Sequence, residues 1–253
     1  MMQESDAACS FPPLAEPYDG ALRAAVAWIL ARFEVLGIIA SGTIIRGNPG
    51  PSSDLDLYVI HARPQRQRLQ YTFEGVPAEI FVNPVRTIEG YFKDEREEGR
   101  PITAHMLATG YVVLRRDAVV DRLREQARAL LAAPPDPTPG RLRMMRYMAA
   151  TAYEDARDVA EADPATAGMI LSRAVHEMLQ YCFWRANRYL PRDKDLLDAL
   201  RDLDADLAGV ARAFYSGEAF ERRLALAEQI ADQTIGVRGF FEWESTPEDV
   251  AED

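Results

Sequence analysis

The 253-residue chain has few cysteines and histidines and no long apolar run. Its two cysteines, Cys9 and Cys182, and its three histidines, His61, His105 and His176, have no spacing typical of a zinc site. Two cysteines could form at most one disulfide, so a reducing, cytoplasmic location is expected. No apolar run approaches the roughly 18 residues that a spanning helix needs, so no membrane association is expected.

Basic residues are also scarce relative to acidic ones. Lysine occurs only at positions 93 and 194, and 40 Asp and Glu outnumber 29 Lys and Arg, for a net charge of −11. A polynucleotide ligand calls for a basic surface, so nucleic acid is not expected as a partner. An acidic cleft would instead assist the capture of a cationic ligand.

The order of the chain predicts two domains of the α+β class. Residues 1–17 lack a basic region followed by an apolar one, and we interpret them as a flexible tail and not as a signal peptide. A small mixed sheet flanked by helices is expected over residues 18–133. The proline-rich stretch 134–140 cannot continue a helix and indicates a linker. An all-α helical bundle is expected over 141–242, followed by an acidic tail at 243–253.

Hydrophobic periodicity places the individual elements. In the first domain it predicts helices at 18–34, 85–98 and 118–131, and strands at 35–41, 53–60, 69–73, 76–82 and 110–114. In the second domain it predicts helices at 141–161, 165–190, 195–215 and 218–235.

Two carboxylates two residues apart, Asp54 and Asp56, mark the second strand. A strand repeats every two residues, so both should project from one face, roughly 6–7 Å apart, while Leu55 and Leu57 enter the core on the other. Two like charges this close favour a bound cation, and oxygen ligands suit Mg²⁺ together with substrate phosphates. A solvated turn before the strand is the ordinary alternative.

The segment between the first two strands predicts a phosphate site. Gly42 follows the apolar run 35–41, and glycine there lets backbone N–H groups approach an anion. Thr43 adds a hydroxyl, and Arg46 adds a guanidinium suited to phosphate oxygens. The loop that follows, rich in Pro and Gly, ends at Ser53.

A third acid, Glu79, interrupts the apolar strand 76–82. A lone charge is unfavourable there unless it is paired or binds something. Pro77 leaves open an edge strand with Glu79 facing solvent, because proline is confined to strand edges and starts.

The order Gly42-Thr43, Arg46-Gly47, Ser53-Asp54-Leu55-Asp56 and then Glu79 resembles the DNA polymerase β-like nucleotidyltransferase superfamily. Within it, the chain is most similar to the small enzymes that adenylylate antibiotics, the kanamycin and streptomycin nucleotidyltransferases. The matching residues span roughly 35–83. The family usually has Ser after the glycine, whereas this chain has Thr43, which keeps the hydroxyl.

This resemblance implies a chemistry for the predicted site. Asp54 and Asp56 would hold two Mg²⁺ ions together with Glu79, which would also accept the proton of the acceptor hydroxyl. Gly42, Thr43, Arg46 and Ser53 would bind the phosphates of ATP or another nucleoside triphosphate. The acceptor would be a small hydroxylated molecule such as an aminoglycoside, and a homodimer is expected only at the level of the family.

The helical domain resembles the acceptor-binding domain of the same enzymes. Lys194, in the segment 190–195, lies where streptomycin-type enzymes place a phosphate-binding lysine. A solvated lysine at a helix start is the alternative.

Two other functions stay open at this point. One is an antitoxin-like enzyme that adenylylates a protein, although such proteins are much shorter. The other is a nucleotide-binding protein without catalysis, which intact acids at 54, 56 and 79 argue against.

Overall fold

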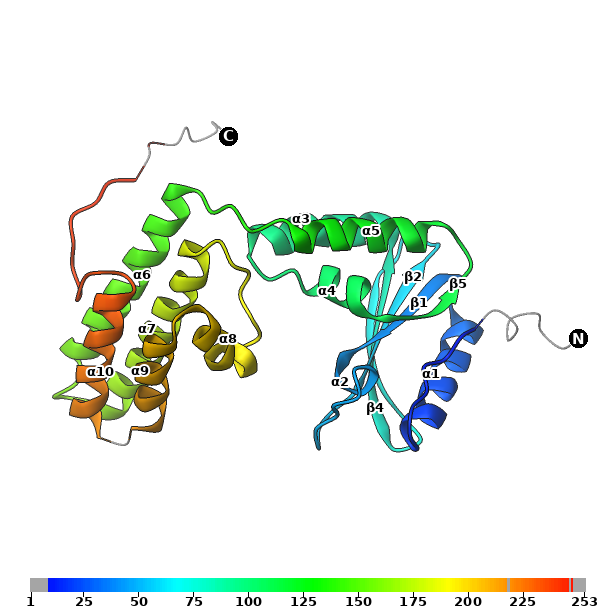
Figure 1. Ribbon diagram of the computed structural model, residues 1–253, viewed down its shortest axis with the longest axis horizontal. Helices are drawn as coiled ribbons and strands as arrows, with labels where there is room; N and C mark the ends of the chain where they lie inside the picture. Colours follow the sequence, from blue (N-terminus) through cyan, green and yellow to red (C-terminus); the bar gives the residue numbers. More distant parts are fainter. Residues whose placement is uncertain (1–8, 218, 246, 248–253) are drawn as a thin grey trace, which may run out of the picture. The chain divides into compact units, whose positions relative to one another are not determined.

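The computed structural model describes residues 9–217, 219–245 and 247. Contacts between Cα atoms divide the chain into two compact units, Met1–Ala133 and Pro134–Asp253. The first unit contains a sheet and the second is helical (Figure 1). No helix in the described ranges is long and apolar enough to cross a membrane.

The N-terminal unit is built on a mixed five-stranded sheet in the order β3-β4-β2-β1-β5. Strand β2 pairs in parallel with β4, and the other neighbouring pairs are antiparallel. The strands are β1 (Val35–Ser41), β2 (Leu55–His61), β3 (Gln67–Phe73), β4 (Val76–Pro84) and β5 (Tyr111–Arg115).

Alternation along the central strands separates two apolar layers. Leu57 and Val59 of β2 pack with helix α1 (Tyr18–Arg32) on one face. Tyr58 and Ile60 pack on the other face with helices α3 (Val85–Glu97), α4 (Ile102–Thr109) and α5 (Val119–Ala132). Both faces of the sheet are thus covered by helices, as the nearly continuous apolar runs of β1 and β2 require.

A tight turn joins β3 to β4. Glu74 and Gly75 both have positive φ, 49° and 81°, as a two-residue hairpin turn of type I′ needs. The turn sets the register, which places Gln70 opposite Glu79.

Three features of the N-terminal unit differ from the expectation. Residues 102–109 form α4, which the periodicity did not predict, and Gly42–Ile45 form a single helical turn, α2, where a loop was expected. The described part of the predicted flexible tail is held against the sheet. Ser10 N donates to Val113 O at 2.8 Å, and the backbone of Cys9 forms an isolated antiparallel β-bridge with that of Leu114.

The C-terminal unit consists of helices packed around one apolar core. They are α6 (Pro139–Asp158), α7 (Pro164–Arg185), a short 3₁₀ turn η2 (Asp193–Asp195), α8 (Leu196–Leu203), α9 (Ala205–Ser216) and α10 (Phe220–Gln233). Thr138, Asp163 and Asp204 each cap a helix by accepting a backbone N–H, and Thr and Asp are residue types favoured at this position.

The boundaries in this unit correct the prediction at three places. The helix expected from residue 141 begins at Pro139, inside the expected linker, because proline is favoured at the first helical position. The helix expected to reach residue 190 ends at Arg185. The helix expected over 195–215 is divided at Asp204, which has extended backbone.

Candidate active site

Strands β2 and β4 bring the three predicted acids together. The parallel register pairs Asp56 with Glu79, and Asp54 comes directly before β2. One carboxylate oxygen of each of the three residues lies within 4.8 Å of the others, and all three side chains are half-buried. The predicted cluster of Asp54, Asp56 and Glu79 is therefore present, with Asp54 just outside the strand that was expected to contain it.

The cluster occupies one end of a sheet face whose middle is closed by aromatic rings. Tyr58 and Phe81 follow Asp56 and Glu79 by two residues on their strands, so they project to the same face. Their rings stack with centroids 6.0 Å apart at an interplanar angle of 16°. Leu55 and Leu57 are buried in the layer on the opposite face, as predicted. This arrangement anchors the strands on both sides while the carboxylates stay partly accessible.

Glu79 is held by two side chains of β3. Arg68 donates to Glu79 Oε1 from Nε at 2.6 Å and lies 2.5 Å from it through Nη2, and Gln70 Nε2 donates to the same oxygen at 3.3 Å. The Glu79 side chain is 13% exposed, against 67% for Arg68. The edge-strand alternative for Glu79 is wrong, because β4 lies between β3 and β2.

The backbone at Gly42 lies against the Asp56 carboxylate. Gly42 has a φ of +89°, and a Cβ built at this position would lie 2.5 Å from Asp56 Oδ2. Any side chain at residue 42 would therefore displace Asp56 as well as strain the backbone. Glycine is needed here for close approach to Asp56, whereas the approach of its backbone to a phosphate stays a prediction.

Thr43 and Ser53 join the two ends of the segment between β1 and β2. Their hydroxyl oxygens are 2.7 Å apart, and Gly50 N donates to Ser53 Oγ at 2.8 Å. Ser53 directly precedes Asp54, so this contact holds the start of α2 next to the carboxylate cluster. Thr43 keeps the hydroxyl chemistry expected of a serine, and the structure gives that hydroxyl a definite partner.

The two predicted phosphate-binding cations, Arg46 and Lys194, lie in different units of the chain. Arg46 ends α2, its side chain is exposed, and it forms no ion pair with any described residue. Lys194 lies in η2 of the C-terminal unit and is exposed. It is not among the residues that the N-terminal unit brings together, so its contact with a nucleotide stays a prediction.

Asp54, Asp56 and Glu79 offer a donor set that fits a hard divalent cation. Three carboxylate oxygens lie close enough for one ion to contact them, and oxygen-only ligation is what Mg²⁺ prefers. The nearby guanidinium of Arg68 already balances part of this negative charge. One carboxylate of the cluster, Glu79, is therefore already paired with a cationic group of the protein.

Arg68 and Gln70 were missed as site residues in the sequence. The signal was available, because the two-residue turn at Glu74 and Gly75 sets Gln70 opposite Glu79. Arg68 lies two residues further along β3 and therefore on the same face. Alternating polar residues on an exposed strand gave no reason to single these two out.

No model of a protein family matches the sequence, and no curated protein matches it either. Among solved structures, the chain is similar to the crystal structure of a nucleotidyltransferase-like protein from Exiguobacterium sibiricum. The TM-score is 0.53 at 16% identity, and the match covers 85% of this chain and 73% of that one. This chain has a nucleotidyltransferase-like fold.

The nucleotidyltransferase-like fold confirms the fold class expected from the sequence, and membership of the superfamily stays a prediction. An identity of 16% shows the fold alone, so the narrower resemblance to antibiotic-modifying enzymes stays a prediction. Within this fold, the carboxylate cluster on β2 and β4 is the strongest candidate for a catalytic centre.

Proposed function

We propose that the protein is a magnesium-dependent nucleotidyltransferase that moves a nucleoside monophosphate, most simply AMP from ATP, onto a hydroxyl of a small molecule. The observation that carries the proposal is the convergence of Asp54, Asp56 and Glu79 next to Gly42 in a nucleotidyltransferase-like fold. Each of these groups alone is common in proteins. Their combination in one fold unit supports phosphate chemistry.

The reaction is a displacement at the α-phosphorus of the nucleotide. The acceptor oxygen forms a bond to this phosphorus, the bond to the bridging oxygen of the β-phosphate breaks, and pyrophosphate leaves with the electron pair. The acceptor proton passes to Glu79. Mg²⁺ held by Asp54, Asp56 and Glu79 would supply charge neutralisation for the phosphates.

The contacts of Glu79 suit its role as the general base. Arg68 and Gln70 both bond to Oε1, which leaves Oε2 without a hydrogen bond from a described residue. A carboxylate held by one oxygen keeps its orientation while the other oxygen stays available to accept a proton. Positioning of this kind contributes much of the rate in phosphoryl transfer.

Gly42, Thr43, Ser53 and Arg46 would orient the outgoing phosphates. Thr43 and Ser53 offer hydroxyl groups beside the cluster, and the exposed guanidinium of Arg46 lies at the end of the same helical turn. The fork of an arginine matches phosphate oxygens well. Lys194 is proposed as a further phosphate ligand from the C-terminal unit.

The acceptor is proposed to be a small, hydroxylated and cationic molecule, with an aminoglycoside as the model. The net charge of −11 favours a cation over a polynucleotide. Modification of a partner protein, or nucleotide binding without catalysis, are the alternatives that the experiment must separate.

The experiment is a measurement of pyrophosphate release from each nucleoside triphosphate with Mg²⁺. The acceptor panel holds aminoglycosides, lincosamides and other hydroxylated small molecules. Asp56→Asn tests the cluster, and Asp202→Asn, an exposed aspartate of the C-terminal unit, is the matched change of charge. Acceptor-dependent release that disappears only in Asp56→Asn supports the proposal. Nucleotide binding without release across the panel contradicts it and favours the alternatives.

A further inference from the structure

The C-terminal segment 234–245 lies along helix α6 in the antiparallel direction. Gly239 is next to Glu154, the Trp243 ring is 5.2 Å from the Tyr147 ring, and Arg143 Nη1 donates to Glu244 O. The segment therefore covers one side of α6 for about three turns, and it follows α10 within the same compact unit.

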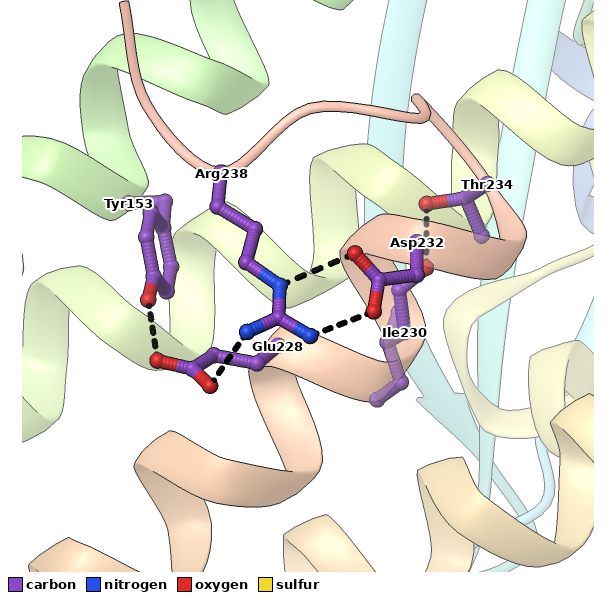
Figure 2. Close-up of polar contacts among 6 residues, drawn as sticks. All are labelled: Tyr153, Glu228, Ile230, Asp232, Thr234 and Arg238. Carbon is purple, nitrogen blue, oxygen red and sulfur yellow. Dashed lines mark hydrogen bonds and ion pairs between the residues drawn. The ribbon is translucent and has the colours of Figure 1, made fainter.

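Arginine side chains fix this segment at several points. Arg146 Nε donates to Ile235 O at 2.7 Å, and Arg185 Nη1 donates to Thr234 O at 2.6 Å. Arg238 bonds to Asp232 at 2.9 and 2.5 Å and to Glu228 at 2.8 Å, and Tyr153 donates to Glu228 at 3.0 Å (Figure 2). These contacts hold the segment at Thr234, Ile235 and Arg238, the last of which directly precedes Gly239.

A cavity of about 270 Å³ lies between α6 and this segment. That volume lies just below the range of about 300–1,000 Å³ typical of small-molecule sites, so it suits a ligand of few atoms. Its lining combines four aromatic rings with two carboxylates, from Tyr147, Glu154, Phe240, Phe241, Glu242 and Trp243.

The electrostatics of the cavity favour a cation. Neither Glu154 nor Glu242 forms an ion pair or a hydrogen bond with any residue that the structure describes, and the lining carries no basic side chain. The faces of aromatic rings attract cations, and carboxylates bind ammonium groups by charge-assisted hydrogen bonds. Arg146 already lies over the Phe241 ring at 4.4 Å, so this segment accepts one cation of the protein itself.

The exposure of the aromatic rings also favours a ligand site at this cavity. Phe240 is 83% exposed, the largest value among the large apolar side chains of the described residues, and Tyr147 is 37% exposed. Gly239, with a φ of +99°, turns the chain between the network of Arg238 and these rings. Exposed apolar side chains gathered beside a cavity are typical of a ligand-binding surface.

We propose that this cavity binds a small organic cation that carries ammonium groups, such as a polyamine. The rings of Tyr147, Phe240 and Trp243 would contact its methylene groups and ammonium faces, and Glu154 and Glu242 would accept its N–H groups. The site uses only residues of the C-terminal unit and does not depend on nucleotidyl transfer.

Calorimetric titration of the full chain with spermidine, in the absence of nucleotide and metal, tests the proposal. Saturable binding is expected, and the double variant Glu154→Gln and Glu242→Gln should weaken it by about tenfold or more. The control is Glu161→Gln with Glu221→Gln, which removes the same charge from exposed positions outside the cavity.

The outcomes separate a site from a general charge effect. Absent binding, or equal weakening in the cavity variant and the control, overturns the proposal. Tyr147→Ala should also weaken binding severalfold, because the ring supplies part of the contact. Since all the altered carboxylates are exposed, circular dichroism should show unchanged folding in each variant. A binding loss in a folded cavity variant alone supports the site.

Discussion

Arg68 Nη2 lies 2.5 Å from Glu79 Oε1, so the guanidinium of an exposed edge strand neutralises one of the three clustered carboxylates. Arg68 also lies over the Phe81 ring, with its Cζ 5.0 Å from the centroid. A metal ion at Asp54, Asp56 and Glu79 would have to share Glu79 with this guanidinium. The protein therefore carries its own cation at the site where we propose that Mg²⁺ binds.

We expect Arg68→Ala to bind divalent cations more tightly, by about two- to fivefold, the range of one partly exposed ion pair. Removal of the guanidinium frees Glu79 and takes away a repulsive charge. Calorimetric titration with Mn²⁺ measures the change in affinity. Arg66→Ala is the matched control, since Arg66 contacts Tyr91 and not the cluster. Equal binding in Arg68→Ala would contradict this prediction, and weaker binding would show that Arg68 assists the metal.

Gly42→Ala should weaken metal binding at the carboxylate cluster more than Gly47→Ala does, although both substitutions strain the backbone to the same degree. Both Gly42 and Gly47 have positive φ, +89° and +77°, so alanine strains each by roughly 1–2 kcal/mol. Only at residue 42 does the new Cβ meet a carboxylate, because nothing lies within 4 Å at Gly47. We expect Mn²⁺ binding to fall at least tenfold in Gly42→Ala and to be unchanged in Gly47→Ala. The same loss in both variants would trace it to backbone strain.

Asp54→Asn and Asp56→Asn should abolish turnover and leave the fold intact. Each removes one of three neighbouring negative charges, so the metal-free protein should unfold at the same temperature or a higher one. We expect Mg²⁺ and ATP to raise the unfolding temperature of the unaltered protein and not that of the variants, because a ligand stabilises only a folded protein that binds it. Thermal unfolding with and without these ligands measures this. Near-normal turnover in either variant would remove the metal role.

The carboxylate cluster was accessible from the sequence because its parts are local. A period of two placed Asp54 and Asp56 on one face, and the apolar neighbours of Glu79 marked it as a charge that needs a partner. The parallel pairing of β2 with β4, which sets Asp56 opposite Glu79, is a contact between distant segments. Local periodicity carries no information about such pairing, so the assignment of Glu79 to the cluster depended on the upstream motif at 42–56 and on the family resemblance.

The errors in the helical unit have local causes that the sequence does contain. Asn187 has a φ of 52° just after α7, and asparagine is one of the few residues that tolerate this conformation at a helix end. Asp204 divides the helix expected over 195–215 by accepting Leu207 N at 2.9 Å. Apolar periodicity continues across both positions, so the periodic signal hid the capping signal.

The cap at Asp204 gives a test of this interpretation. Asp204→Ala should lower the free energy of unfolding by about 1 kcal/mol, since the Leu207 N–H loses its acceptor. Asp206→Ala, which removes an acid from the same first turn without removing the cap, is the control. Urea unfolding followed by circular dichroism measures both. Equal destabilisation would indicate an effect of helix charge instead of the cap.

Glu177 on α7 makes the stability of the C-terminal unit depend on pH. Its Oε2 is buried without a hydrogen-bond partner in the described structure. Burial raises the pKa of Glu177 above its ordinary value of 4.5, and Arg173 and His176 oppose the rise. Because the pKa is higher in the folded protein, the folded state binds more protons once the pH exceeds 4.5, and stability falls as the pH rises through the folded-state pKa.

Glu177→Gln removes this ionisation, so its effect should appear only where the carboxylate is charged. We expect the variant to equal the unaltered protein at pH 4 and to exceed it at pH 8 by a few tenths to about 1 kcal/mol, a modest gain because the side chain is partly exposed. Urea unfolding at both pH values measures this difference. Glu161→Gln, at an exposed position of the same unit, should show no such gain. A gain of the same size at pH 4 and pH 8 would contradict the argument, since an effect of packing or amide hydrogen bonding does not follow the charge of the carboxylate.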